Sequence, residues 1–197
     1  DNLNGAIDQA GLRSQLAYQI TKKGNELKRD MEFNLVGVNV AAVSGAAGTA
    51  RKTASLSAWL TSNVSRGTGG ASGTLSNGMP NAAATDASAG NMRAFTETIL
   101  KAVIQSTWSA GGEPQFLMVG PFNKQAVSAF SGIAAQRYMA PSDSPTTIIG
   151  AADVYMSDFG TLQVVPNRFS RERDAYLIDP DMVELVTLRD MAVPELA

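Results

Sequence analysis

The longest segment with a sustained helical period in this chain runs from Leu12 to Leu35. At about 100° per residue its apolar residues fall in one stripe, the pattern of a helix that packs one face on a core. The stripe consists of Leu12, Leu16, Ala17, Ile20, Gly24, Leu27, Met31 and Leu35. At a rise of about 1.5 Å per residue, such a helix is more than about 30 Å long, the width of a small domain. We therefore predict one long helix around which the other elements are organised.

Two aromatic residues of this predicted helix, Tyr18 and Phe33, point away from the apolar stripe. Large aromatic side chains outside a core-facing stripe indicate a second contact on the far side of the helix. Gly24 lies in the helix interior, where glycine costs about 1 kcal/mol relative to alanine and often allows another backbone to come close. We expect Tyr18 and Phe33 to be covered by another element or by a partner.

The composition excludes several classes of protein. A chain of 197 residues with 44% hydrophobic residues can form one sizeable domain or two small ones. The net charge of -2 lacks the excess of Lys and Arg that marks a dedicated nucleic-acid-binding protein. No apolar run approaches the roughly 20 residues that span a bilayer. We therefore expect a globular protein without a membrane partner.

The chain contains no cysteine and no histidine. Their absence excludes disulfides, thiolate metal sites, cysteine nucleophiles and any mechanism with histidine as general base or metal ligand. An enzyme would need carboxylate, lysine or serine chemistry, and no such residues are spaced to suggest it. We therefore predict that the protein is not an enzyme and has no catalytic residues, cofactor, metal or small-molecule substrate.

The part of the chain after residue 91 predicts helices that flank a sheet. Asn91 is a candidate cap for the first of these helices, and Gly160 lies in the turn of a predicted hairpin. The predicted helices are 92–110 and 121–130, and the predicted strands are 115–119, 153–159, 161–167, 175–180 and 182–189. Residues 132–150 contain prolines and turn formers and are predicted to be a loop.

The middle of the chain is rich in small residues. Residues 38–50 predict a loop or a short strand, and residues 51–64 predict either a short helix or an irregular segment. Residues 65–91 contain few charges and predict a long structureless loop, which in a compact domain is usually a binding loop, a crossover or a mobile segment. We expect a domain boundary near the start of that loop.

Neither common nucleotide-binding motif is present. Lys52-Thr53 lacks both glycines that let a phosphate loop wrap its ligand. The glycines between residues 67 and 73 neither follow a predicted strand nor open a helix directly, so they do not fit the dinucleotide-binding pattern.

Aspartates and arginines cluster near the predicted strands. The aspartates are Asp153, Asp158, Asp174, Asp179 and Asp181. They could hold a metal through oxygen ligands, but stabilising turns is the interpretation we favour, since Asp accepts hydrogen bonds from its own backbone. Arg168, Arg171 and Arg173, near Glu172 and Asp174, fit a solvated loop, an anion site or salt bridges between subunits.

Five ordered blocks of the sequence resemble one known family. The blocks are residues 16–32, 50–60, 118–130, 153–169 and 176–189. Together they resemble the major capsid (major head) proteins of tailed bacteriophages and prophages, which have the Hong Kong 97-like capsid fold. Each block alone is a weak signal, and the resemblance lies in their order and their coverage of most of the chain.

This resemblance implies an α+β fold with a long spine helix, a peripheral domain and an axial domain. Residues 1–66 and 173–197 would form the peripheral domain, with the spine helix at 9–36, and residues 67–172 would form the axial domain. The terminal strands at 174–189 would lie beneath the spine helix. Relative to the family, the N-terminal arm and the extended loop before the spine helix are missing, so the resemblance implies an internal core fragment.

The function implied is that of a structural subunit of an icosahedral capsid, which self-assembles into hexamers and pentamers that enclose DNA. Its partners would be further copies of itself, scaffolding or decoration proteins, and packaged DNA without sequence specificity. It would be located in the virion after assembly in the bacterial cytoplasm. The residues expected at contacts between subunits are Tyr18, Phe33, Arg168, Arg171 and Arg173. Two alternatives are an α+β ligand-binding or enzyme domain with the 65–91 loop as a lid, and another phage structural protein such as a tail protein.

Overall fold

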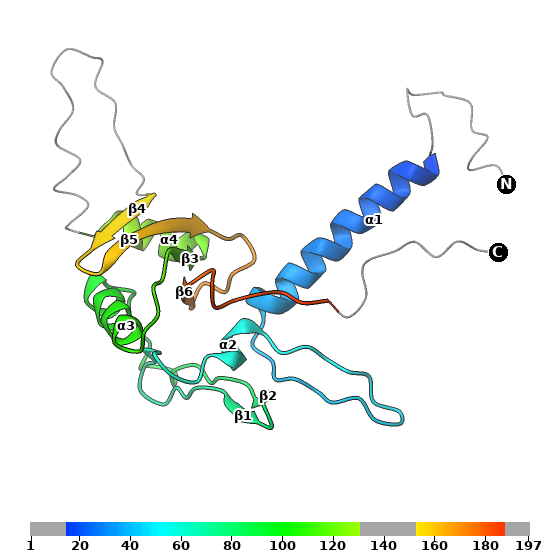
Figure 1. Ribbon diagram of the computed structural model, residues 1–197, viewed down its shortest axis with the longest axis horizontal. Helices are drawn as coiled ribbons and strands as arrows, with labels where there is room; N and C mark the ends of the chain where they lie inside the picture. Colours follow the sequence, from blue (N-terminus) through cyan, green and yellow to red (C-terminus); the bar gives the residue numbers. More distant parts are fainter. Residues whose placement is uncertain (1–14, 131–152, 188–197) are drawn as a thin grey trace, which may run out of the picture. The chain divides into compact units, whose positions relative to one another are not determined.

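The computed structural model describes residues 15–130 and 153–187, and Figure 1 shows the path of the chain. The start of the long helix before Gln15, the predicted 132–150 loop and the end of the last predicted strand lie outside the described residues. The chain forms two compact units. The first unit is Asp1–Ala94 with Arg168–Arg171, and the second is Phe95–Asn167 with Glu172–Ala197.

The long helix of the first unit is confirmed from Gln15 onward. Helix α1 spans Gln15–Glu32 and continues as a π-helical turn, η1, over Phe33–Gly37. Gly37 is needed at this end because a Cβ there would lie 2.6 Å from the Phe33 ring and 2.8 Å from the carbonyl oxygen of Phe169. Gly24 is different: within the described structure no atom lies within 4 Å of the position its Cβ would take. The expected close approach of another backbone at Gly24 is therefore wrong.

A two-stranded extension, which we call the arm, covers residues 40–54 of the first unit. Val43 and Lys52 exchange backbone hydrogen bonds of 3.0 and 3.1 Å, and Ala46 and Thr49 do the same at the tip. At the base, the nitrogen of Ser55 donates to the oxygen of Val40 at 3.0 Å. The arm then leads into the short helix α2, Leu56–Trp59. The interpretation of 51–64 as a short helix is thereby confirmed at these four residues.

The prediction of a structureless loop over 65–91 is wrong for its central part. Strands β1, Thr74–Ser76, and β2, Met79–Ala82, form an antiparallel hairpin. Asn77 and Gly78 in its turn have φ values of 49° and 76°, the left-handed conformation that Asn-Gly adopts in tight hairpin turns. Further backbone bonds between Ala71 and Thr85 extend the pairing.

The second unit contains a four-stranded sheet in the order β4-β5-β3-β6. Its strands are β3, Phe116–Val119, β4, Val154–Ser157, β5, Gly160–Pro166, and β6, Ala175–Ile178. Strand β3 pairs parallel with β5 and antiparallel with β6, and β4 pairs antiparallel with β5. The hairpin predicted around Gly160 is confirmed, as is the mixed helix and sheet content.

Helices α3, Glu97–Ser109, and α4, Pro121–Ser128, accompany this sheet. The core is apolar and well buried, and it consists of Leu100, Ile104, Leu117, Val119, Val127, Phe130, Tyr155, Leu162 and Val164. The predicted start of α3 after Asn91 is wrong. Thr96 caps the helix instead, because its backbone is extended and its hydroxyl accepts a hydrogen bond from the Ile99 nitrogen at 3.4 Å.

Of two predictions about the end of the chain, one is wrong and the other stays a prediction. Strand β6 pairs with β3 in the sheet of the second unit, and its expected place beneath the long helix stays a prediction. The predicted strand at 182–189 is not formed over 182–187, where every residue is exposed and no strand pairing is present among the described residues.

The units also differ in extent from the domains that the resemblance implied. The predicted division lay between residues 66 and 67, whereas the units divide between Ala94 and Phe95. Residues 67–94 belong to the first unit, and backbone hydrogen bonds connect them to its earlier part. The nitrogen of Ala42, for example, donates to the oxygen of Pro80 at 2.9 Å. The Asn39 amide likewise donates to the Ala84 oxygen.

Candidate assembly surfaces

The apolar stripe of α1 is largely exposed. Ile20 and Leu27 keep 39% and 47% of their surface accessible, and Ala17 is also exposed. Met31 and Leu35, at the C-terminal end, are half-buried. The prediction that this face packs on a core of the same chain is therefore wrong for the described part of the helix before Met31. An amphipathic pattern shows that a face is suited to burial, and it does not show that the covering surface belongs to the same molecule.

The two aromatic residues predicted on the far side of the helix are also exposed. Tyr18 and Phe33 each keep nearly half of their surface accessible. Helix α1 thus presents large apolar side chains on two faces, and their role in contacts between subunits stays a prediction.

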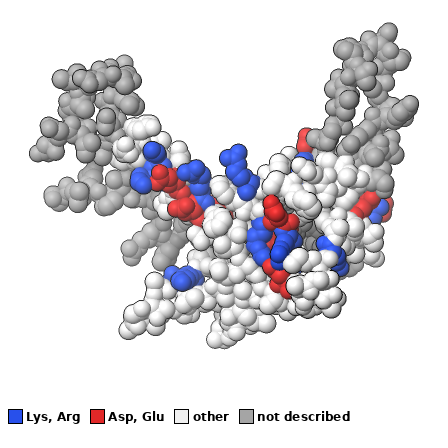
Figure 2. Space-filling model, turned by 180° about the vertical axis from the view of Figure 1, so that it is seen from behind, with Lys and Arg blue, Asp and Glu red and all other residues white. Residues whose placement is uncertain are grey.

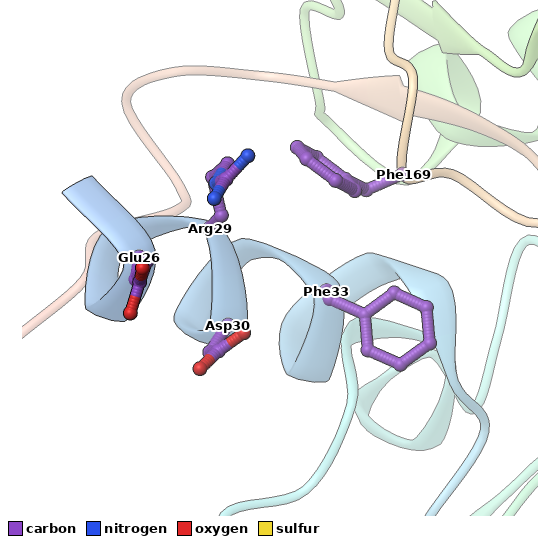
Figure 3. A pocket seen from close by; sticks show the side chains of 5 residues that line it. All are labelled: Glu26, Arg29, Asp30, Phe33 and Phe169. Atoms are coloured by element: carbon purple, nitrogen blue, oxygen red, sulfur yellow. The ribbon is translucent and has the colours of Figure 1, made fainter. Parts of the chain in front are cut away.

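A hollow of about 360 Å³ lies beside the C-terminal half of α1. It is lined by Glu26, Arg29, Asp30, Phe33 and Phe169 (Figure 3). Glu26 and Asp30 are one helical turn apart, and their carboxylates extend on one side of the helix, whereas Arg29 extends on the side of Phe169. The arrangement offers two carboxylates and an aromatic ring on one side of the hollow.

Glu26 in this hollow already has one neighbour of opposite charge. The ammonium group of Lys23 lies 2.7 Å from its carboxylate, and this hydrogen bond holds the pKa of Glu26 below its ordinary value and raises that of Lys23. Both groups are solvent-accessible, so the pair contributes little to stability. Through the part of the chain that the structure describes, no ion pair to Asp30 is formed.

The base of the arm is fixed by a buried polar network. The hydroxyl of Ser55 accepts from the Val40 nitrogen at 3.0 Å and lies 3.1 Å from the hydroxyl of Ser57. Ser57 donates to the side-chain oxygen of Asn39 at 2.8 Å. Residues 44–53 beyond this base are all exposed. The arm therefore has a fixed root and a solvent-accessible tip.

The predicted arginine residues do not form one site. Arg171 is partly buried and pairs with Asp86 inside the first unit. Arg168 and Arg173 are exposed, and they belong to the first and second units respectively. Arg171 therefore has an ion-pair partner in its own unit, and the part of Arg168, Arg171 and Arg173 in subunit contacts stays a prediction.

The interpretation of the aspartates as turn residues is confirmed at Asp179. Its two carboxylate oxygens accept hydrogen bonds from the backbone nitrogens of Asp181 and Glu113, each at 3.0 Å. Asp153 instead forms an ion pair of 2.9 Å with Lys124. Over residues 15–130 and 153–187, no group of three metal-ligating side chains is present.

The second unit exposes apolar side chains around the β4–β5 hairpin. Trp108 of α3 packs against Phe159 with ring centroids 5.3 Å apart, and both remain partly exposed. Val154 and Met156 on the edge strand β4 are also exposed, Met156 to 71%. Such a combination of an edge strand and an apolar surface is suited to contact with another protein.

The side chain of Tyr155 connects this hairpin to helix α3 through a hydrogen bond. Tyr155 donates to the carboxylate of Glu97 at 3.1 Å, and Glu97 also pairs with Lys101 at 2.9 Å. Burial raises the pKa of Tyr155 to about 12, and the neighbouring carboxylate acts in the same direction.

Charged side chains are sparse on the face shown in Figure 2. Among the described residues on this face, basic and acidic groups lie side by side with wide uncharged areas between them, and they form no continuous basic surface. None of the helices in the described residues is long and apolar enough to cross a membrane.

Both units expose apolar side chains, and such surfaces are suited to contact with other macromolecules. The family model described as SU10 major capsid protein matches residues 2–197. The chain belongs to this family of phage major capsid proteins and is a structural capsid subunit of the virion. The prediction of a phage major capsid protein that serves as a structural capsid subunit is thereby confirmed. A search of curated proteins gave no match.

Proposed function

We propose that this chain builds the phage head by self-assembly into hexamers and pentamers, with a Hong Kong 97-like fold in which α1 is the spine helix. The observation that carries the proposal is the exposure of both apolar faces of α1 in a member of a capsid protein family. Covering such faces in every copy gives each subunit the same set of contacts, which is how closed symmetric assemblies form.

The two units suggest how the capsid domains are divided. In this proposal the unit that contains α1 contributes the peripheral domain, and the unit with the four-stranded sheet contributes the axial domain. The boundaries then follow the compact units, in place of the division at residues 66/67 and 172/173.

The subunit acts without catalysis, as is general for capsid structural proteins. Contacts with packaged DNA are local and non-specific, because the net charge is -2 and the basic residues are scattered. Scaffolding or decoration proteins are further partners, and assembly takes place in the host cytoplasm. The alternative is a ligand-binding domain in which a structureless 65–91 loop acts as a lid. Residues 74–82 instead form a hydrogen-bonded hairpin, so nothing supports this alternative.

Electron microscopy of the purified protein, combined with analytical ultracentrifugation over a range of concentrations, tests the proposal. We expect rings, sheets or shells that grow with concentration, and hexameric or pentameric units in the images. A protein that stays monomeric at every concentration and salt condition would refute self-assembly.

A further inference from the structure

We propose that the arm of one subunit docks on helix α1 of a neighbouring subunit, with Arg51 entering the hollow between Glu26, Asp30 and Phe33. The inference rests on the proposed self-assembly, because it requires a second copy of the chain. It names the two surfaces that meet and the charged groups that align them.

The acceptor surface is the acidic side of α1, where Glu26 pairs with the exposed Lys23 of the same helix and Asp30 forms no ion pair among the described residues. Glu26 and Asp30 place two carboxylates side by side, and the exposed ring of Phe33 lies at the same hollow. A guanidinium group can pair with carboxylates through two parallel hydrogen bonds while its flat face lies on an aromatic ring. Arg29 extends on the opposite side toward Phe169, so the incoming charge meets the acidic side of the hollow.

The arm has the complementary charge. Between Glu32 and Asp86 the sequence contains no acidic residue, and Arg51 and Lys52 are the charged residues of the arm. The arm therefore has two positive charges and no negative charge of its own to neutralise them.

The conformation of the arm also prepares Arg51 for this contact. A Cβ at Gly45 would lie 2.6 Å from Cγ and 2.9 Å from Nε of Arg51, so the arginine side chain lies across the arm in the space that glycine leaves open. Fixing the stem of a long side chain before binding lowers the entropy lost on forming the contact. The residues of the tip, Ala46, Ala47, Gly48 and Thr49, are small enough to let the arm approach a helix closely.

A second copy fits both surfaces better than a nucleic acid does. A phosphate backbone would attract Arg51 and Lys52, but it would leave the Glu26 and Asp30 carboxylates and the exposed apolar residues of α1 uncovered. Arm and hollow both belong to the first unit, and the arm projects away from α1 (Figure 1). A contact between two different patches of identical subunits is head-to-tail and produces rings when the rotation closes.

The natural absence of cysteine allows a direct test. The variants Arg51→Cys and Asp30→Cys are prepared separately, mixed, assembled and treated with a short bis-maleimide, because an arginine–carboxylate contact holds the two Cβ atoms farther apart than the roughly 4 Å that a disulfide requires. We expect a covalent dimer that depends on both variants, because neither single variant contains both partners of the contact. The double variant should give a ladder of covalent oligomers, which a link within one chain cannot give.

The matched control replaces Asp30→Cys with Lys28→Cys, which changes an exposed residue on another side of α1. We expect at least tenfold less cross-linked dimer from the control mixture. Particles that form without the Arg51–Asp30 cross-link, or with equal yields from the control, would overturn the arm contact and leave self-assembly intact. A wild-type protein that forms no particles would overturn both.

Discussion

The two units of the subunit bury different kinds of residues. The second unit has a core of large side chains from helices α3 and α4, from Phe130 just after α4, and from strands β3, β4 and β5. The buried residues of the first unit are mostly small, among them Ala54, Ser55, Ser57, Ala58 and Ala84, while its longest helix exposes Ile20 and Leu27. The second unit therefore has a large apolar core of its own, whereas the first unit exposes apolar surfaces that a partner can cover.

The largest effect should come from the core of the second unit. Leu117 is fully buried on the central strand β3, and Leu117→Ala should lower the free energy of unfolding by about 2–5 kcal/mol because it leaves a cavity. Urea unfolding of the unassembled subunit measures the change. Met156→Ala on the exposed face of the same sheet is the control and should stay within about 0.5 kcal/mol. Equal losses in the two variants would show that the second unit has no dominant core.

A glycine pair tests the weaker packing of the first unit. Gly37→Ala should destabilise by about 1–3 kcal/mol, because the added methyl group collides with the carbonyl oxygen of Phe169. Gly24→Ala lies in open space within α1 and should stabilise by about 0.5–1 kcal/mol. Thermal unfolding of both variants gives the comparison. If Gly37→Ala leaves the unfolding temperature unchanged, the close contact between Gly37 and the carbonyl oxygen of Phe169 is absent in solution.

Alkaline pH should act on the second unit through Tyr155. Its pKa in the folded protein is raised to about 12, above the ordinary value of 10.0, so the unfolded chain loses this proton first. The contribution of Tyr155 to the free energy of unfolding is therefore fully present below pH 10, and it is lost as the pH rises from 10 toward 12. Tyr155→Phe should flatten this part of the stability curve, measured by urea unfolding at several pH values. An unchanged slope would contradict the proton linkage.

The smallest effect on the free subunit should come from the exposed stripe. Leu27→Ala should change the unfolding free energy by less than about 0.5 kcal/mol, because Leu27 is 47% exposed. The same variant should reduce the yield of assembled particles, measured by sedimentation. A large loss of stability in the unassembled subunit would mean that this face packs within the chain, as its periodicity alone predicted.

Local patterns predicted much of the fold. The period of α1, the Pro121 start of α4 and the turn at Gly160 depend on nearby residues, and all three are present. The Asn77-Gly78 pair is a hairpin-turn signal, but the residues around it are small and polar and are more typical of a loop than of two strands. The cap of α3 was misplaced because Asn91 and Thr96 are both good caps and only the backbone conformation selects between them.

Long-range pairing and the covering of surfaces could not be predicted. Strand β6 is apolar enough to fit several partners, and its pairing with β3 depends on residues far away in the sequence. Phe169 reaches the hollow beside Glu26 although more than a hundred residues separate them. The stripe of α1 has the same periodicity whether its cover comes from its own chain or from a neighbour.

Hydrogen–deuterium exchange of the unassembled subunit and of the assembled particle tests most directly whether neighbours cover the first unit. Exchange should slow strongly on assembly over α1 and over the arm at residues 40–54, since their exposed surfaces become buried. The core strands β3 and β5 should be protected in both states and change little. Unchanged exchange over α1 and the arm in assembled particles would contradict the view that neighbouring subunits cover these surfaces.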